Sequence, residues 1–127
     1  MKKFGSLLVF SVMLLAYGRV VLTVEWDPSS VKEFQGTILY VERNLAVFKT
    51  ADGAQFELHL GPAPYLKKHG IVLLPGSKVS VKGMVLNVRD KYHLFAQRIK
   101  YGVKALNIRD KDGKPLWKLN LRRKVSD

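Results

Sequence analysis

Residues 75–83 read Pro-Gly-Ser-Lys-Val-Ser-Val-Lys-Gly, and this stretch decides the fold prediction. Pro75-Gly76 favours a turn, because proline presets φ for the first central position and glycine tolerates a positive φ at the second. Valines then alternate with lysine and serine, which predicts a half-buried strand over residues 78–88. Gly83 inside this strand indicates a bulge or a sharp bend.

Four further segments show the same alternation of β-branched or aromatic residues with polar residues, each bounded by turn residues. These predicted strands span residues 35–41, 45–50, 55–60 and 92–100. Asp52-Gly53 predicts a type I′ hairpin, because both residues tolerate positive φ. A short helical turn closed by Gly70 is expected between the third and fourth strands, over residues 65–70.

This order of elements resembles the small exported bacterial proteins of the OB-fold class, the barrel that binds oligonucleotides and oligosaccharides. Residues 34–100 carry the resemblance, through residues 34–38 (Phe-Gln-Gly-Thr-Ile), the Asp52-Gly53 pair and residues 75–83. It implies an all-β, five-stranded Greek-key barrel whose sharp bends lie at Gly36 and Gly83. Such barrels are often linked to envelope stress or small-ligand binding, and no site residues are carried over from them.

The ends of the chain add three segments to the barrel, which is predicted over residues 34–102. Residues 105–109 and 116–121 flank a turn and predict an added C-terminal hairpin, followed by a frayed basic tail, so that residues 103–127 form one unit. Residues 19–33 form an N-terminal extension, and residues 1–18 precede it as a signal peptide.

The signal peptide is predicted from a short basic start, an apolar run over residues 4–16 and a small-x-small cleavage site ending at Gly18. Cleavage there would leave a periplasmic or secreted protein. The alternative is an uncleaved N-terminal helix that anchors the chain in the membrane, because residues 20–24 are apolar again. Arg19 would then lie at depth at a cost of ~2.5 to 3.5 kcal/mol, which favours cleavage.

The chain contains no cysteine and three histidines. The first fact excludes disulfides, thiolate metal sites and a cysteine nucleophile. His59, His69 and His93 lack any supporting nucleophile motif, so we predict a non-enzymatic protein without a cofactor. His59 and His69 flank one linker near Glu57, but solvated surface residues are favoured over a metal site there.

The net charge is +12, and its distribution along the chain is uneven. Residues 61–127 contain sixteen Lys and Arg against four acidic residues, whereas residues 19–60 contain four against six. This asymmetry predicts a binding module for an anionic ligand or an envelope protein, with possible association with a membrane surface. The candidate anion-binding residues are Lys78, Lys82, Arg89, Lys91, Arg98 and Lys100.

Aromatic residues suggest two other surfaces. Tyr65 is expected to plug one end of the barrel or to line a pocket, and Trp117 to pack the C-terminal hairpin or to contact a partner. The latter supports an alternative function, a structural accessory subunit of an envelope or membrane-associated complex. Phe48 and Phe56 could stack on nucleic-acid bases, but core packing is favoured, and export further disfavours nucleic acid.

Overall fold

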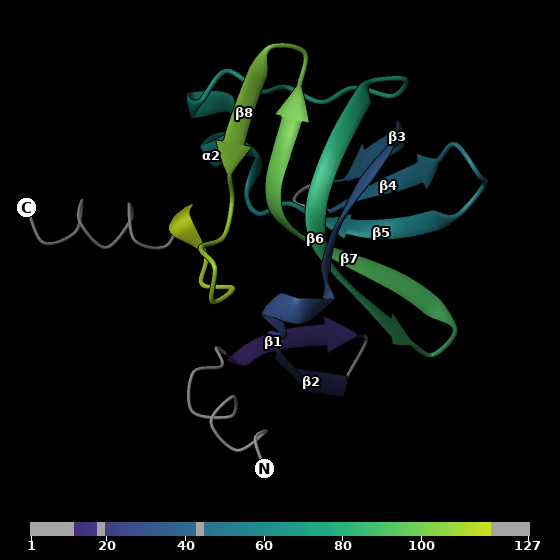
Figure 1. The fold of residues 1–127 in the computed structure, drawn as a ribbon, viewed down its shortest axis with the longest axis vertical. Helices are drawn as coiled ribbons and strands as arrows, with labels where there is room; N and C mark the ends of the chain where they lie inside the picture. Colours follow the sequence, from purple (N-terminus) through teal and green to yellow (C-terminus); the bar gives the residue numbers. More distant parts are fainter. Residues whose placement is uncertain (1–11, 18–19, 43–44, 118–127) are drawn as a thin grey trace, which may run out of the picture.

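The computed structural model describes residues 12–17, 20–42 and 45–117 of the 127-residue chain (Figure 1). Strands β1 (Val12–Tyr17) and β2 (Val20–Glu25) pair with each other as an antiparallel hairpin. The start of the predicted signal peptide and its cleavage point lie outside the described residues, so export and cleavage stay predictions. Within the described ranges, no helix is long and apolar enough to span a membrane.

Five strands close into a barrel. They are β3 (Val31–Glu42), β4 (Leu45–Thr50), β5 (Gln55–His59), β6 (Lys78–Val88) and β7 (Lys91–Tyr101). Antiparallel pairing runs in the order β5-β4-β3-β6-β7, and a parallel pairing of β5 with β7 closes the ring. The short helix α2 (Ala63–Lys68) lies between β5 and β6 along the chain. The predicted all-β, five-stranded barrel with a helical link between its third and fourth strands is therefore confirmed.

One extra strand, β8 (Lys104–Asn107), pairs antiparallel with β7 outside the ring. The predicted C-terminal hairpin differs in its second arm, because Leu116 and Trp117 are helical and only an isolated bridge joins Arg109 to Pro115. Residues 118–121 of that arm lie outside the described residues. Because β5 pairs with β7 only at residues 93–95, the far end of β7 has unpaired backbone groups, and β8 supplies their hydrogen-bond partners.

Two glycines permit close backbone approaches in the barrel. A Cβ on Gly83 would lie 2.2 Å from the carbonyl oxygen of Phe95, and one on Gly36 would lie 2.2 Å from that of Lys49. The register between β6 and β7 shifts at Lys82 and Gly83, so the bulge predicted there is confirmed.

The turn predicted as type I′ at Asp52-Gly53 is wrong in detail. Only Gly53 has a positive φ, of 97°, whereas Arg89 (51°) and Asp90 (65°) together have the two positive φ angles of such a turn. The Asp52 carboxylate instead accepts a hydrogen bond from the backbone N–H of Ala54 at 3.3 Å. This local side-chain bond stabilises Asp52 without a left-handed conformation.

The described residues form two hydrophobic cores. The larger one fills the barrel and includes Ile38, Phe48 and Leu94. The smaller one lies on the outer side of β6 and β7, where Trp26 packs with Met84 and Phe95. The indole Nε1 of Trp26 donates a hydrogen bond to the carbonyl oxygen of Lys111 at 3.1 Å, so the segment before β3 is fixed to both the barrel and the C-terminal turn.

Barrel strand β3 begins before the predicted boundary at residue 34. Val31 already pairs with Met84, and a 3-10 helix, η1 (Pro28–Ser30), precedes it. The predicted N-terminal extension therefore contributes its last three residues to the barrel.

Candidate functional site

Four of the six predicted anion-binding residues share one outer face of the barrel. Lys78 and Lys82 lie on β6, Arg98 and Lys100 lie on β7, and all four are exposed. Lys82 is directly opposite Arg98 in the antiparallel register. The intervening valines and isoleucine point into the barrel, so alternation turns these four charges outward. We call these four residues the basic face.

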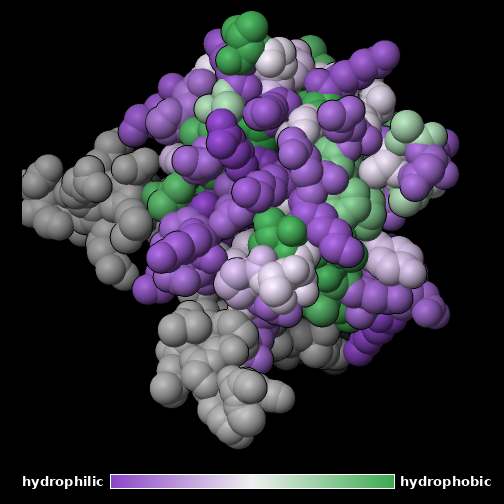
Figure 2. Space-filling model, viewed as in Figure 1, coloured by the Kyte–Doolittle hydropathy of each residue, from purple (hydrophilic) through white to green (hydrophobic). Residues whose placement is uncertain are grey.

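The cations of the basic face outnumber the acidic side chains beside them. Within the described part of the chain, none of its four residues forms an ion pair. Glu33 on β3 is the register partner of Lys82 and borders the face as an acidic side chain, and its Oε2 accepts a hydrogen bond from Ser80 Oγ at 2.8 Å. Figure 2 shows hydrophilic residues covering most of the surface in that view. The face can therefore attract an anion from solution.

A shallow groove of about 780 Å³ lies at one end of the basic face. Lys78, Lys100 and Lys49 line it together with one acidic residue, Glu33, and with small, polar and apolar residues of β3, β4 and β6. Lys49 adds a fifth exposed cation, which was not among the predicted anion-binding residues. The groove is too open to enclose a small molecule, and it suits a flat or extended anionic partner.

The other two predicted cations lie elsewhere. Arg89 is in the turn that joins β6 to β7, and Lys91 begins β7 at that same end of the hairpin. The Nζ atom of Lys91 forms an ion pair with Glu57 Oε2 at 3.1 Å. The β6–β7 hairpin is eleven residues long on each side, which separates these two residues from the basic face.

Tyr65 and Trp117 pack against the barrel core as half-buried side chains. The Tyr65 hydroxyl donates a hydrogen bond to the carbonyl oxygen of Asn107 at 3.1 Å, and its ring centroid lies 6.3 Å from that of Trp117. A Cβ on Gly61 would lie 2.7 Å from the Trp117 ring. The two aromatic side chains thus cover the β5–α2 connection, and a partner contact through them stays a prediction.

Phe48 and Phe56 are buried in the core, as the sequence favoured. Their rings are stacked on each other with centroids 6.4 Å apart. Neither ring offers the exposed surface that base stacking requires.

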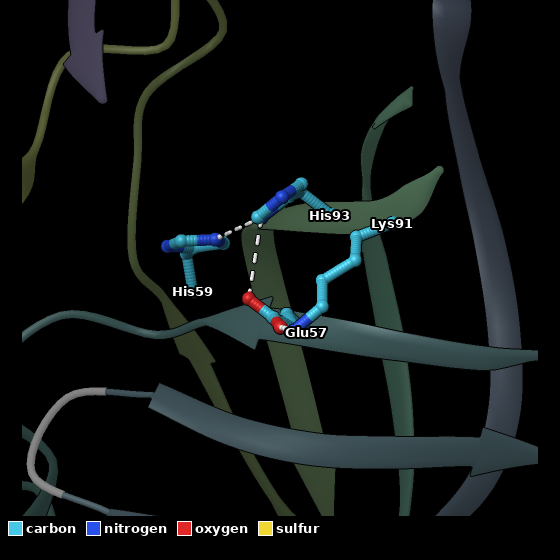
Figure 3. Close-up of polar contacts among 4 residues, drawn as sticks. All are labelled: Glu57, His59, Lys91 and His93. Atoms are coloured by element: carbon cyan, nitrogen blue, oxygen red, sulfur yellow. Dashed lines mark hydrogen bonds and ion pairs between the residues drawn. The ribbon is translucent and has the colours of Figure 1, made fainter. Parts of the chain in front are cut away.

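A second polar cluster lies at the β5–β7 seam, where Glu57 and His59 of β5 face Lys91 and His93 of β7 (Figure 3). His59 Nε2 lies 2.9 Å from His93 Nδ1, and Glu57 Oε1 lies 3.7 Å from that same nitrogen. Because Leu58 points into the core, its neighbours Glu57 and His59 point out of the barrel.

Burial sets the protonation of both imidazoles. Burial lowers the pKa of His59 from 6.5 to about 3, and repulsion by His93 in its protonated form and by the Arg109 guanidinium adds to this effect. The pKa of His93 is also lowered by burial, an effect that the carboxylate of Glu57 opposes. Both rings are therefore neutral near pH 7, with one nitrogen of each able to accept a proton or bind a metal ion.

Arg109 covers this cluster from the segment after β8. It is 7% exposed, and its Nη1 donates hydrogen bonds to the carbonyl oxygens of Ala96 at 2.6 Å and His59 at 3.2 Å. Its guanidinium carbon lies 5.8 Å from the centroid of the Phe95 ring. Burial lowers the pKa of Arg109 to about 10, so its charge is retained at neutral pH.

The histidine pair considered in the sequence analysis is not the pair that meets. His59 meets His93, whereas His69 is exposed and lies against Tyr65 at the end of α2. His93, which was not considered as a ligand in the sequence analysis, is only 1% exposed. The predicted barrel contained a usable signal, because its closure places the third strand beside the fifth and therefore brings residues 55–60 toward residues 92–100.

The model of a protein family, described as the MamS/MamX magnetosome protein family, matches residues 30–106. The chain belongs to this family. The MamS/MamX match begins within η1 and ends in β8, so it includes the whole barrel. Both the basic face and the β5–β7 cluster lie inside the MamS/MamX range, whereas Arg109 and Trp117 follow it. No curated protein matches the chain.

Proposed function

We propose that this MamS/MamX chain is a non-enzymatic accessory protein of a membrane-associated magnetosome system and binds an anionic partner through its basic face. The observation that carries the proposal is the convergence of Lys78, Lys82, Arg98 and Lys100 on one outward surface without an acidic counterpart in ion-pair range among the described residues. The family name supplies the magnetosome context.

Membrane phospholipid headgroups are the anionic partner that this context favours. A row of cations on a rigid sheet can contact several headgroups together, and each Lys or Arg near an anionic membrane contributes about 1 kcal/mol. Such attraction is screened by salt over roughly 8 Å at physiological ionic strength. Binding should therefore weaken steeply as salt is added.

The proposal also assigns the barrel to the OB-fold class and the chain to export. The pairing order of the five barrel strands and the position of α2 support membership of the OB-fold class. The basic start and apolar run of residues 1–16 support export, which would place the barrel on the outer side of a membrane.

The test is sedimentation of the full chain with vesicles of anionic or zwitterionic phospholipid at increasing salt. The double variant Lys82→Glu/Arg98→Glu should lower the affinity for anionic vesicles by at least roughly thirtyfold, because removal of two favourable charges alone is worth about 2 kcal/mol. The matched control is Lys67→Glu/Lys68→Glu, which reverses two exposed charges on α2. Equal losses for both pairs would show that net charge acts without a specific face, and would refute the proposal.

A second candidate function, docking of a protein partner, is favoured by an exposed apolar surface. Val41 and Val72, which are 38% and 53% exposed, contribute to this surface. Val41 and Val72 also line an apolar groove of about 390 Å³ beside α2. Co-purification with a magnetosome protein that resists salt and is abolished by Val72→Asp would support this function over anion binding.

A further inference from the structure

We propose that Glu57, His59 and His93 form a binding site for one divalent first-row transition-metal ion. The inference goes beyond the proposed function, because it rests on the β5–β7 seam and does not depend on the basic face. One ligand atom from each of the three side chains lies within 4.8 Å of the others. Two imidazoles and one carboxylate form a ligand set that suits zinc, iron, cobalt or nickel and leaves coordination positions open.

The spacing of the ligand atoms fits a metal ion at their centre. With metal–ligand bonds of ~2.0 to 2.1 Å, two ligands of a tetrahedral ion lie roughly 3.3 Å apart. Two of the observed separations bracket this value, at 2.9 Å between His59 Nε2 and His93 Nδ1 and 3.7 Å between Glu57 Oε1 and His93 Nδ1. The ligand atoms of Glu57 and His59 lie within 4.8 Å of each other, so a movement of these two side chains toward a common centre would complete the site.

The two facing histidine nitrogens share a hydrogen bond whose place a metal ion can take. Neutral imidazoles 2.9 Å apart require one nitrogen to donate and the other to accept. The lowered pKa values of both rings keep them in the neutral form that binds metals. When both facing nitrogens bind the ion, the proton of the donor ring moves to the other nitrogen of that ring, so both imidazoles stay neutral and no net proton is released near pH 7.

The surroundings of the cluster orient the three ligands. Lys91 holds Glu57 through Oε2, so that Oε1 is the oxygen directed toward the histidines (Figure 3). The His59 ring stacks on Phe95 with centroids 4.5 Å apart, which fixes its plane. Arg109 directs its Nη1 to backbone carbonyls and not to Glu57, so it does not compete for the carboxylate. Such outer contacts are typical of metal sites.

An ion has a route to this site from solvent. The Glu57 side chain is 23% exposed, whereas that of His93 is 1% exposed. The site therefore combines one accessible ligand with one fixed, buried ligand. Exchangeable binding is expected, since the carboxylate can capture an ion at the surface before the imidazoles bind it.

The test uses the full chain, freed of metal with EDTA and titrated with Zn²⁺ by calorimetry and with Co²⁺ by visible absorption. The wild-type chain should bind one equivalent of Zn²⁺, and its melting temperature should rise with Zn²⁺ concentration. His59→Gln and Glu57→Gln should each weaken Zn²⁺ binding by roughly tenfold or more. The matched control is His69→Gln, which removes the third histidine and should leave the affinity unchanged.

NMR of the histidine ring nitrogens tests the same site in the unaltered chain, in case a variant fails to fold. Zn²⁺ should shift the signals of His59 and His93 and leave those of His69 in place. The proposal is overturned if the wild-type chain takes up no Zn²⁺ or Co²⁺. It is equally overturned if binding survives His59→Gln in a folded variant, or if His69 is the ring that responds.

Discussion

Trp26 packs against the backbone of Gly113, and we expect the two positions to be energetically coupled. Trp26 is 0% exposed. A Cβ on Gly113 would lie 2.6 Å from the ring atoms Cγ and Cδ2 of Trp26, and Gly113 has a φ of 83°. Two separate penalties therefore oppose an alanine at position 113, the left-handed backbone and the collision with the indole.

The effect of each substitution on the free energy of unfolding can be estimated separately. Trp26→Ala should lower the free energy of unfolding by about 3 to 5 kcal/mol, the usual cost of removing a buried aromatic side chain. Gly113→Ala should lower the free energy of unfolding by about 1 to 2 kcal/mol through its left-handed φ, whichever residue is at position 26. The collision with the indole adds a further loss when Trp26 is present. In the double variant the methyl group occupies space that the indole has left. The double variant should thus be more stable than the sum of the single changes, by about 1 to 3 kcal/mol.

Urea unfolding followed by circular dichroism measures all four free energies of the cycle. The matched control is Gly76→Ala, because Gly76 has a φ of 91° and a Cβ there would meet nothing within 4 Å. Its effect should add to that of Trp26→Ala. If Gly113→Ala is also additive with Trp26→Ala within about 0.5 kcal/mol, the packing of the N-terminal segment on the C-terminal turn is refuted.

Two further predictions concern the barrel and its seam. Gly83→Ala should lower the urea midpoint of unfolding by more than Gly53→Ala does. A Cβ at position 83 would meet the carbonyl oxygen of Phe95, whereas a Cβ at position 53 would meet nothing within 4 Å. Equal effects would contradict the close approach at Gly83. In the metal-free chain, His59 has a folded-state pKa of about 3 against its ordinary 6.5, so the unfolded chain binds more protons between these values and stability falls as pH is lowered through them. Protonation of His59 in the unfolded chain should lower the free energy of unfolding by about 2 kcal/mol between pH 7 and pH 5. His59→Gln should remove this contribution from the pH profile of unfolding. An unchanged profile would show that His59 is not buried as a neutral ring.

Local patterns were sufficient to predict the barrel strands and several of their irregularities. Alternation over residues 78–88 predicted β6 with its observed bounds, and Leu45–Thr50 likewise matches β4. The bulge at Gly83 was visible as a glycine inside an alternating run. These features depend on interactions between near neighbours in sequence, because side-chain alternation and glycine tolerance act within a few residues.

The turn type predicted at Asp52-Gly53 was less reliable than the predicted strands. Asp52-Gly53 has the composition of a type I′ turn, yet the Asp52 side chain bonds to the backbone of Ala54 and the two positive φ angles occur instead at Arg89 and Asp90. Arg89-Asp90 carries no glycine to indicate them. The β6–β7 pairing around that turn imposes its geometry.

The sequence by itself determined that this is a small β-barrel with a cationic second half and no cysteine chemistry. Only the tertiary structure decided which cations lie together on one face, because the length of the β6–β7 hairpin separates Arg89 from the basic face. It also decided that His59 meets His93. That contact depends on the parallel pairing of β5 with β7, which joins residues more than thirty positions apart. Such long-range pairing is selected by closure of the whole barrel, and no local pattern at either histidine specifies it.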